Sequence, residues 1–181
     1  MGDTEYIAAF QHVVLPAAYS FAPQVILISA GFDAGINDPL GGYEVHPETF
    51  GHFIMMLRPL AEGRLILALE GGYNLTTTTH AMALSTKALL GDPIIMPKNI
   101  YKNFSYHAML SIRDVMEHFK QYFEVFKVHK KLPNKPVIIR RIQKFTADTY
   151  ARVLFKVLDP DRIDDNDYVE TEMSILNALA C

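Results

Sequence analysis

The sequence has one cysteine, no tryptophan and no long hydrophobic run. Half of its 181 residues are hydrophobic, and the single cysteine, Cys181, is the last residue. One cysteine cannot form an internal disulfide, so a disulfide framework and a Cys-rich zinc module are both excluded. The apolar runs have the length of strands, and the acidic start Met-Gly-Asp-Thr-Glu is unlike a signal peptide. We therefore expect a cytoplasmic or nuclear protein that has no membrane partner.

The sequence also lacks an excess of positive charge. Lys and Arg number 17 against 20 Asp and Glu, a formal net charge of −3. Domains that bind phosphate backbones are usually strongly basic, so no direct contact with nucleic acid is expected. Basic residues do gather over 127–144 and acidic residues over 159–172. The basic run is either a solvated face or a surface that docks an acidic partner or nucleic acid.

The seven histidines lack the spacing of a metal site. The chain has no His-x-x-x-His, no adjacent histidine pair and no Asp-x-His. The acidic stretch 159–170 has the length of a calcium loop, but Ile163 and Asp164 stand where a ligand and a glycine are needed. The sequence therefore predicts no self-contained metal centre.

Hydrophobic periodicity predicts alternating helices and strands over the first half of the chain. The apolar strand segments are continuous, which is typical of strands covered on both faces. Alternation of this kind predicts an α/β fold with a parallel sheet between helical layers. The expected elements are a helix over 3–22 ended by Pro23, a strand over 25–28, a helix from Pro47 to about 60, a strand over 65–69, and a Thr-capped helix over 76–90 closed by Gly91.

The character of the chain changes after Pro93. A helix is expected over 107–127, with an apolar stripe that packs on the sheet domain. The remainder, 128–181, is predicted to be a divergent tail that is helical or irregular. We thus divide the chain into a domain portion, 1–127, and a tail, 128–181.

Two loops follow the predicted strands, over 29–42 and 70–75, and ligands bind at the carboxyl ends of the strands in such sheets. Asp33 lies in the first loop, where its carboxylate suits a metal ligand or a general base, or alternatively caps a turn. The segment from Asp38 to Gly42 is typical of a turn. In the second loop, Gly71 and Gly72 allow the backbone to approach a ligand, and Tyr73 either donates to a developing oxyanion or is a core tyrosine.

Taken together, four motifs give a resemblance to a known family. They are Ser29-Ala-Gly-Phe-Asp-Ala34, Asp38-Pro-Leu-Gly-Gly42, Leu69-Glu-Gly-Gly-Tyr-Asn-Leu75 and Leu89-Leu-Gly-Asp-Pro93. In this order and at these separations the sequence resembles the C-terminal part of a zinc-dependent histone deacetylase catalytic domain. It is most similar to class II, especially the class IIb enzymes of the histone deacetylase 6 type. The resemblance is close over about 1–95 and faint to about 127.

The resemblance implies the arginase–deacetylase fold, present here in part, and hydrolysis of acetyl-lysine in proteins such as histones or tubulin. It implies that Asp33 is a zinc ligand and that Tyr73 hydrogen-bonds the acetyl carbonyl and the tetrahedral oxyanion. Leu40 would line the rim of the acyl-lysine tunnel, and Gly71 with Gly72 part of its wall. In this chemistry Zn²⁺ polarises the acetamide carbonyl and activates water, and a histidine acts as general base.

The family's other zinc ligands, in an Asp-x-His motif, and its histidine pair lie upstream of the matching segment, and neither motif is in this sequence. A catalytic zinc ion needs three protein ligands and an open position. We therefore expect a fragment, a splice product or a truncated gene model that is inactive alone, with an upstream half-domain as a partner. The alternative is a non-catalytic interaction protein derived from a deacetylase domain, which would use the tail.

Overall fold

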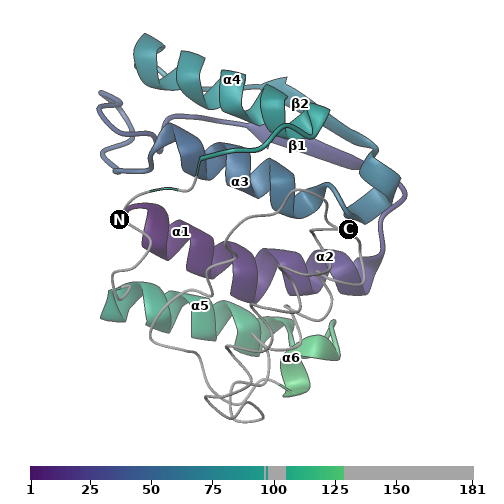
Figure 1. Ribbon diagram of the computed structural model, residues 1–181. Helices are drawn as coiled ribbons and strands as arrows, with labels where there is room; N and C mark the ends of the chain where they lie inside the picture. Colours follow the sequence, from purple (N-terminus) through teal and green to yellow (C-terminus); the bar gives the residue numbers. More distant parts are fainter. Residues whose placement is uncertain (96, 98–104, 129–181) are drawn as a thin grey trace, which may run out of the picture.

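The computed structural model of the chain describes residues 1–95, 97 and 105–128 (Figure 1). The predicted tail therefore lies, except for Val128, outside the described residues, and so do the acidic run and most of the basic run. Within the described part, two parallel strands and their helices follow the predicted order.

The first helical segment is one rod built from three pieces. Helix α1 (Asp3–Ala9), the π-helical turn η1 (Phe10–Val14) and helix α2 (Leu15–Phe21) run end to end (Figure 1). Pro16 gives a reason for the wide turn, because proline has no N–H and its ring crowds the carbonyl four residues earlier. The rod ends where Ala22 takes a left-handed conformation, before Pro23 as predicted.

The sheet consists of β1 (Ile26–Ala30) and β2 (Leu65–Leu69), paired in parallel from Ile26↔Leu65 to Ala30↔Leu69. Helix α3 (Pro47–Leu57) and the short 3-10 turn η2 (Leu60–Gly63) connect the two strands. Helix α4 (Leu75–Leu90) follows β2 and packs against α3. These elements confirm the predicted α/β order.

The prediction that both strands are covered on both faces is wrong for the described residues. Ile28 and Leu67 pack into a core with Phe50 of α3 and residues of α4. Their neighbours point the other way, and Leu27 and Ile66 remain 72% and 58% exposed. Side chains alternate along a strand, and the helices of the described part supply a core to one face of the sheet. The continuous apolar runs of β1 and β2 therefore include side chains on a second face of the sheet, which the described helices do not cover.

Helix α4 begins and ends at specific capping groups. The predicted threonine cap is wrong, because the side chain of Asn74 accepts a hydrogen bond from the Thr77 N–H at 3.0 Å. The helix ends at Gly91, whose φ of 92° is in the left-handed region that glycine adopts without strain, as predicted.

The predicted helix over 107–127 is interrupted. Helix α5 (Tyr106–Phe119) ends before the short helix α6 (Val125–Val128) begins. Ile112 and Met116 of α5 join Ala8 of α1 and the fully buried Phe126 in one cluster. In Figure 1 α5 lies along the α1–α2 rod, on the side opposite α3. The apolar stripe of α5 therefore packs on the domain that contains the sheet, as predicted, and the element that it contacts there is the rod.

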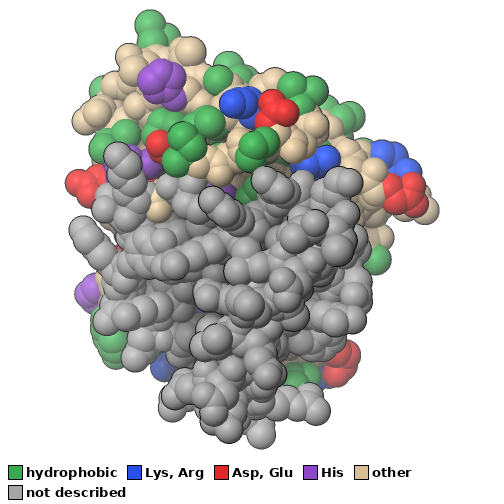
Figure 2. All heavy atoms as spheres, viewed as in Figure 1, with side chains coloured by type: hydrophobic (Ala, Val, Ile, Leu, Met, Phe, Trp, Pro, Cys, Tyr) green, Lys and Arg blue, Asp and Glu red, His purple; other side chains and the backbone are tan. Residues whose placement is uncertain are grey.

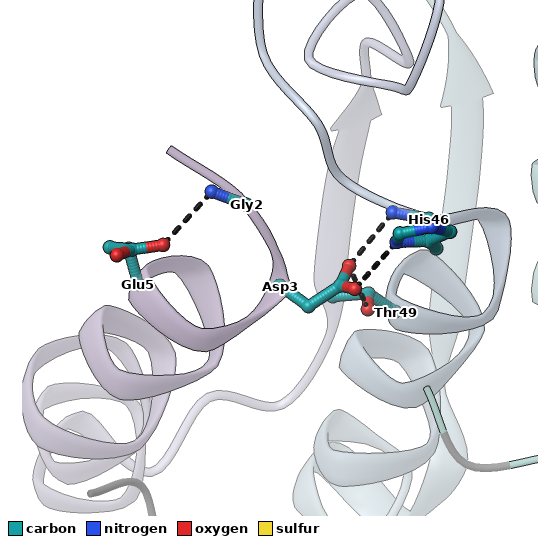
Figure 3. A network of polar contacts seen from close by, with 5 residues as sticks. All are labelled: Gly2, Asp3, Glu5, His46 and Thr49. Carbon is teal, nitrogen blue, oxygen red and sulfur yellow. Dashed lines mark hydrogen bonds and ion pairs between the residues drawn. The ribbon is translucent and has the colours of Figure 1, made fainter. Parts of the chain in front are cut away.

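A buried carboxylate joins the start of α1 to the start of α3 (Figure 3). Asp3, whose side chain is 1% exposed, accepts hydrogen bonds from the His46 N–H at 2.8 Å and from the Thr49 hydroxyl at 2.7 Å. Its second oxygen lies 2.7 Å from Nδ1 of His46. A buried carboxylate is tolerated only when it is paired and hydrogen-bonded, and these contacts satisfy Asp3.

We expect Asp3→Ala to lower the free energy of unfolding by about 2–4 kcal/mol, because three polar groups around the carboxylate lose their partner in a buried place. Asp3→Asn keeps one acceptor oxygen and should cost less. Urea denaturation of both variants measures this difference. An equal, small effect of both would contradict the importance of this contact for the fold.

The exposed outer face of the sheet, which carries Leu27, leads to a second prediction about stability. Leu27→Ala should cost less than about 1 kcal/mol, because the side chain is already exposed to water. Ile54→Ala, in the buried face of α3, should cost about 2–5 kcal/mol. Chemical denaturation of the two variants in parallel compares these costs, and a Leu27 variant as damaging as the Ile54 variant would mean that the outer face is covered in solution.

Candidate active site

The two loops predicted to carry function meet at one edge of the sheet. The parallel pairing continues past the strand ends, with Glu70 N–H donating to the Ala30 carbonyl at 3.1 Å and Phe32 N–H donating to the Gly71 carbonyl at 2.9 Å. The side chain of Phe32 is buried in the core, where it packs with Phe50 of α3. The residues on either side of Phe32 are thereby held next to the Gly71 segment.

The structure brings Asp33 and Tyr73 together across Gly71. A Cβ at Gly71 would stand 3.3 Å from Oδ2 of Asp33 and 3.8 Å from the hydroxyl oxygen of Tyr73. The Asp33 carboxylate and the Tyr73 hydroxyl therefore both lie next to the space that a side chain at Gly71 would occupy. Asp33 is exposed and Tyr73 is 56% exposed, so Tyr73 is not the core tyrosine of the alternative interpretation.

Three glycines, Gly31, Gly41 and Gly71, lie close to Asp33. A Cβ at Gly31 would stand 3.2 Å from Oδ1 of Asp33, and one at Gly41 only 1.6 Å from the Asp33 carbonyl oxygen. Gly72 has a φ of 125°, and a Cβ there would stand 2.5 Å from the Thr78 hydroxyl. The backbone of both loops thus approaches Asp33 closely.

Leu40 is exposed, at 72%, on the loop that carries Asp33. The turn that presents it is held by Asp38, whose Oδ1 accepts from the Leu40 N–H at 2.9 Å and the Gly41 N–H at 3.0 Å. The turn predicted from Asp38 to Gly42 is therefore present. Sequence reasoning missed the hydrogen bond from the Tyr73 N–H to the Asp38 carboxylate. A local sequence pattern does not predict a bond between residues 35 positions apart.

Burial and hydrogen bonding act in opposite directions on Asp38. Desolvation raises the pKa of its carboxyl, but backbone N–H groups of Tyr73, Leu40, Gly41 and Asn74 donate to it and hold the pKa below the ordinary value of 3.8. A carboxyl whose pKa is lowered by folding stabilises the fold above its unfolded pKa, and this stabilisation is lost as pH falls through the folded pKa. Asp38 is thus charged throughout the neutral range.

The described residues do not fit a zinc ion on their own. Among them no group of three His, Cys, Asp or Glu side chains lies close enough together to hold a metal. Asp33 is a single carboxylate, whereas a catalytic zinc ion takes three protein ligands. His52 and His12 are buried rather than gathered near Asp33, and burial, the dominant influence, lowers the pKa of His52.

The described surface is mixed in charge on the face drawn in Figure 2. There Lys and Arg side chains lie beside Asp and Glu side chains and hydrophobic ones (Figure 2). Among the ion pairs of the described residues, Nη1 of Arg64 lies 2.6 Å from Oε2 of Glu62. No helix of the described residues is long and apolar enough to cross a membrane.

The comparisons with known proteins agree on one family. The family model described as histone deacetylase domain matches residues 1–89. Residues 1–89 carry part of a histone deacetylase domain. The matched segment is class II-like, which confirms the resemblance of the four motifs.

Two relatives and one solved structure indicate the extent of the match. The chain is 46% identical over 93 residues to mouse polyamine deacetylase HDAC10 and 57% identical over 81 residues to histone deacetylase 6 of Caenorhabditis elegans. These matches cover 51% and 45% of this chain, but only 14% and 8% of the relatives. The crystal structure of the HDA15 HD domain matches with a TM-score of 0.62 and 36% identity, over 71% of this chain and 34% of that one.

The chain therefore has the histone deacetylase fold in part, with a parallel sheet among helices as predicted. It spans about a third of the HDA15 chain and a smaller share of the two relatives. Whether Asp33, Tyr73, Leu40, Gly71 and Gly72 act as the family resemblance implies stays a prediction, as does the division into 1–127 and 128–181.

The crowding around Asp33 predicts different costs for two adjacent glycines. Gly41→Ala should lower the free energy of unfolding by about 2–3 kcal/mol and displace Asp33, because the added methyl group meets backbone that cannot rotate away. Gly42→Ala is the matched control. It has open space around it and should cost only about 1 kcal/mol, for its φ of 65°. Urea denaturation compares the two, and equal costs would mean that the loop is looser than described.

Proposed function

We propose that this chain supplies part of the catalytic site of a zinc-dependent protein lysine deacetylase of class II. The observation that carries the proposal is the meeting of Asp33 and Tyr73 around Gly71, at the carboxyl ends of two adjacent parallel strands. An exposed carboxylate next to an exposed phenol suits a site where a carbonyl is polarised and a developing negative charge is stabilised.

Each residue has a proposed role. Asp33 is one ligand of a zinc ion that, when bound, supplies Lewis acid chemistry. A catalytic zinc ion takes three protein ligands, and the described residues hold no group of three, so ligands from outside them must complete the site. Tyr73 donates its hydroxyl proton in a hydrogen bond to the acetyl oxygen and to the oxyanion that follows. Leu40 lines the rim of the acyl-lysine tunnel, where an apolar side chain suits a methylene chain. Gly71 and Gly72 form part of its wall, where backbone without a side chain can approach the substrate closely.

The substrate is an acetylated protein, such as a histone or tubulin, and the setting is the cytoplasm, the nucleus or both. Neither a membrane nor nucleic acid is a proposed partner. The chain alone lacks the Asp-x-His and paired-histidine motifs, so the proposed active form includes an upstream half of a deacetylase domain, in a longer product or in a second chain. The competing proposal is a non-catalytic interaction protein derived from the same domain, which would bind partners through 128–181.

We expect the purified chain to release no acetate from an acetyl-lysine peptide or from an acetylated polyamine, and to hold no stoichiometric zinc after gel filtration. Mixing it with a polypeptide that carries the Asp-x-His and paired-histidine motifs should restore deacetylation of the peptide. In that mixture Tyr73→Phe should lower kcat by roughly 10²–10³, the usual effect of losing one oxyanion donor. Acetate and zinc measurements on each sample test these expectations.

Two outcomes would contradict parts of the proposal. Acetate release by the chain alone, lost in Tyr73→Phe, would mean that the site is complete without a partner. A mixture that binds zinc yet stays inactive with every substrate would favour the interaction protein.

A further inference from the structure

Asp38 contacts both loops of the candidate site, and it does so with different oxygens. Oδ1 accepts from the Leu40 and Gly41 N–H groups of its own loop, at 2.9 and 3.0 Å. Oδ2 accepts from the Tyr73 N–H of the other loop at 2.7 Å. The residue is only 8% exposed, so these bonds are shielded from competing water. One carboxylate therefore fixes the backbone of Leu40 and of Tyr73 in a single geometry.

Two other side-chain contacts between the loops lie at the start of α4. The Asn74 side chain donates to the Asn37 carbonyl at 3.0 Å, and the Thr77 hydroxyl donates to the Ile36 carbonyl at 2.8 Å. Both hold the start of the helix, whereas Asp38 holds the backbone of Tyr73 itself. A bond between a charged acceptor and an N–H is also stronger than a bond between neutral groups.

We propose that Asp38 is a positioning residue of the deacetylase site, which sets the place of the Tyr73 hydroxyl relative to the tunnel rim by tying the Tyr73 backbone to the Leu40 turn. This inference rests on the proposed function of Tyr73. Misplacing a group that stabilises an oxyanion weakens catalysis even when the group is still present. Asp38 is thus expected to act through Tyr73, without touching the substrate.

The split between the two oxygens allows a selective variant. Asp38→Asn can keep its amide oxygen toward Leu40 and Gly41, but its NH₂ group then faces the Tyr73 N–H, so a hydrogen bond is replaced by two opposed donors. Asp38→Ser is a second variant, because serine can still cap its own turn but is too short to reach Tyr73. The control is Asp92→Asn, which makes the same chemical change at an exposed residue after the far end of α4.

The first measurement is amide hydrogen exchange by NMR on the full chain. In Asp38→Asn and Asp38→Ser the Tyr73 N–H should exchange roughly tenfold faster or more, as expected for the loss of a bond to a charged acceptor, while the Leu40 and Gly41 N–H groups change little. Asp92→Asn should leave all three unchanged. Exchange that rises at Leu40 and Gly41 but not at Tyr73 would overturn the proposal, since Asp38 would then shape only its own turn. Global unfolding of both variants would overturn it as well.

The second measurement is kinetic, in the reconstituted mixture. Asp38→Asn should lower kcat roughly tenfold with little change in KM, and should have no further effect when Tyr73 is already phenylalanine. Additive effects of the two substitutions would overturn the proposal. If Tyr73→Phe itself leaves activity intact, the proposed function fails, and the exchange measurement still decides whether Asp38 holds the Tyr73 backbone.

Discussion

The parallel pairing of β1 with β2 is the constraint on which the rest of the site depends. Its register, with Ala30 opposite Leu69, brings the next residues of both strands to the same edge. The pairing then continues into the loops through the bonds of Phe32 and Glu70. A register shifted by one residue would turn alternate side chains to the opposite face and separate Asp33 from Gly71. The geometry of the site is therefore set by backbone hydrogen bonds before any functional side chain is considered.

Two buried carboxylates form hydrogen bonds that connect segments far apart in the sequence. Asp3 connects α1 with the start of α3, and Asp38 connects the two loops. Each accepts at least three hydrogen bonds from protein groups, so each is both buried and satisfied. Asp33 differs, because it is exposed and lies close to three glycines, Gly31, Gly41 and Gly71. This contrast separates the carboxylates that hold the structure from the one that is open to a ligand.

Much of the fold could be predicted from local patterns. Pro23 and Gly91 ended their helices as expected, because their backbone restrictions act within a few residues. The packing surface of α5 could not be predicted, since an apolar stripe does not say which neighbour covers it. The same holds for the outer face of the strands, where a run of apolar residues indicated burial that the described helices do not provide. The placement of Asp33 beside Tyr73 followed from strand order, but the bridge from Asp38 depends on tertiary contacts alone.

The open side of the sheet has a consequence for work with the isolated polypeptide. Within the described residues the sheet has two strands, so each strand has one edge without a strand partner, next to the apolar outer face formed by Leu27 and Ile66. Unpaired edges beside exposed apolar side chains are a template for association between copies. Self-association of this kind rises with protein concentration and would occupy the surface that a complementary segment needs. Dilute, freshly prepared protein is accordingly the form in which reconstitution competes best with aggregation.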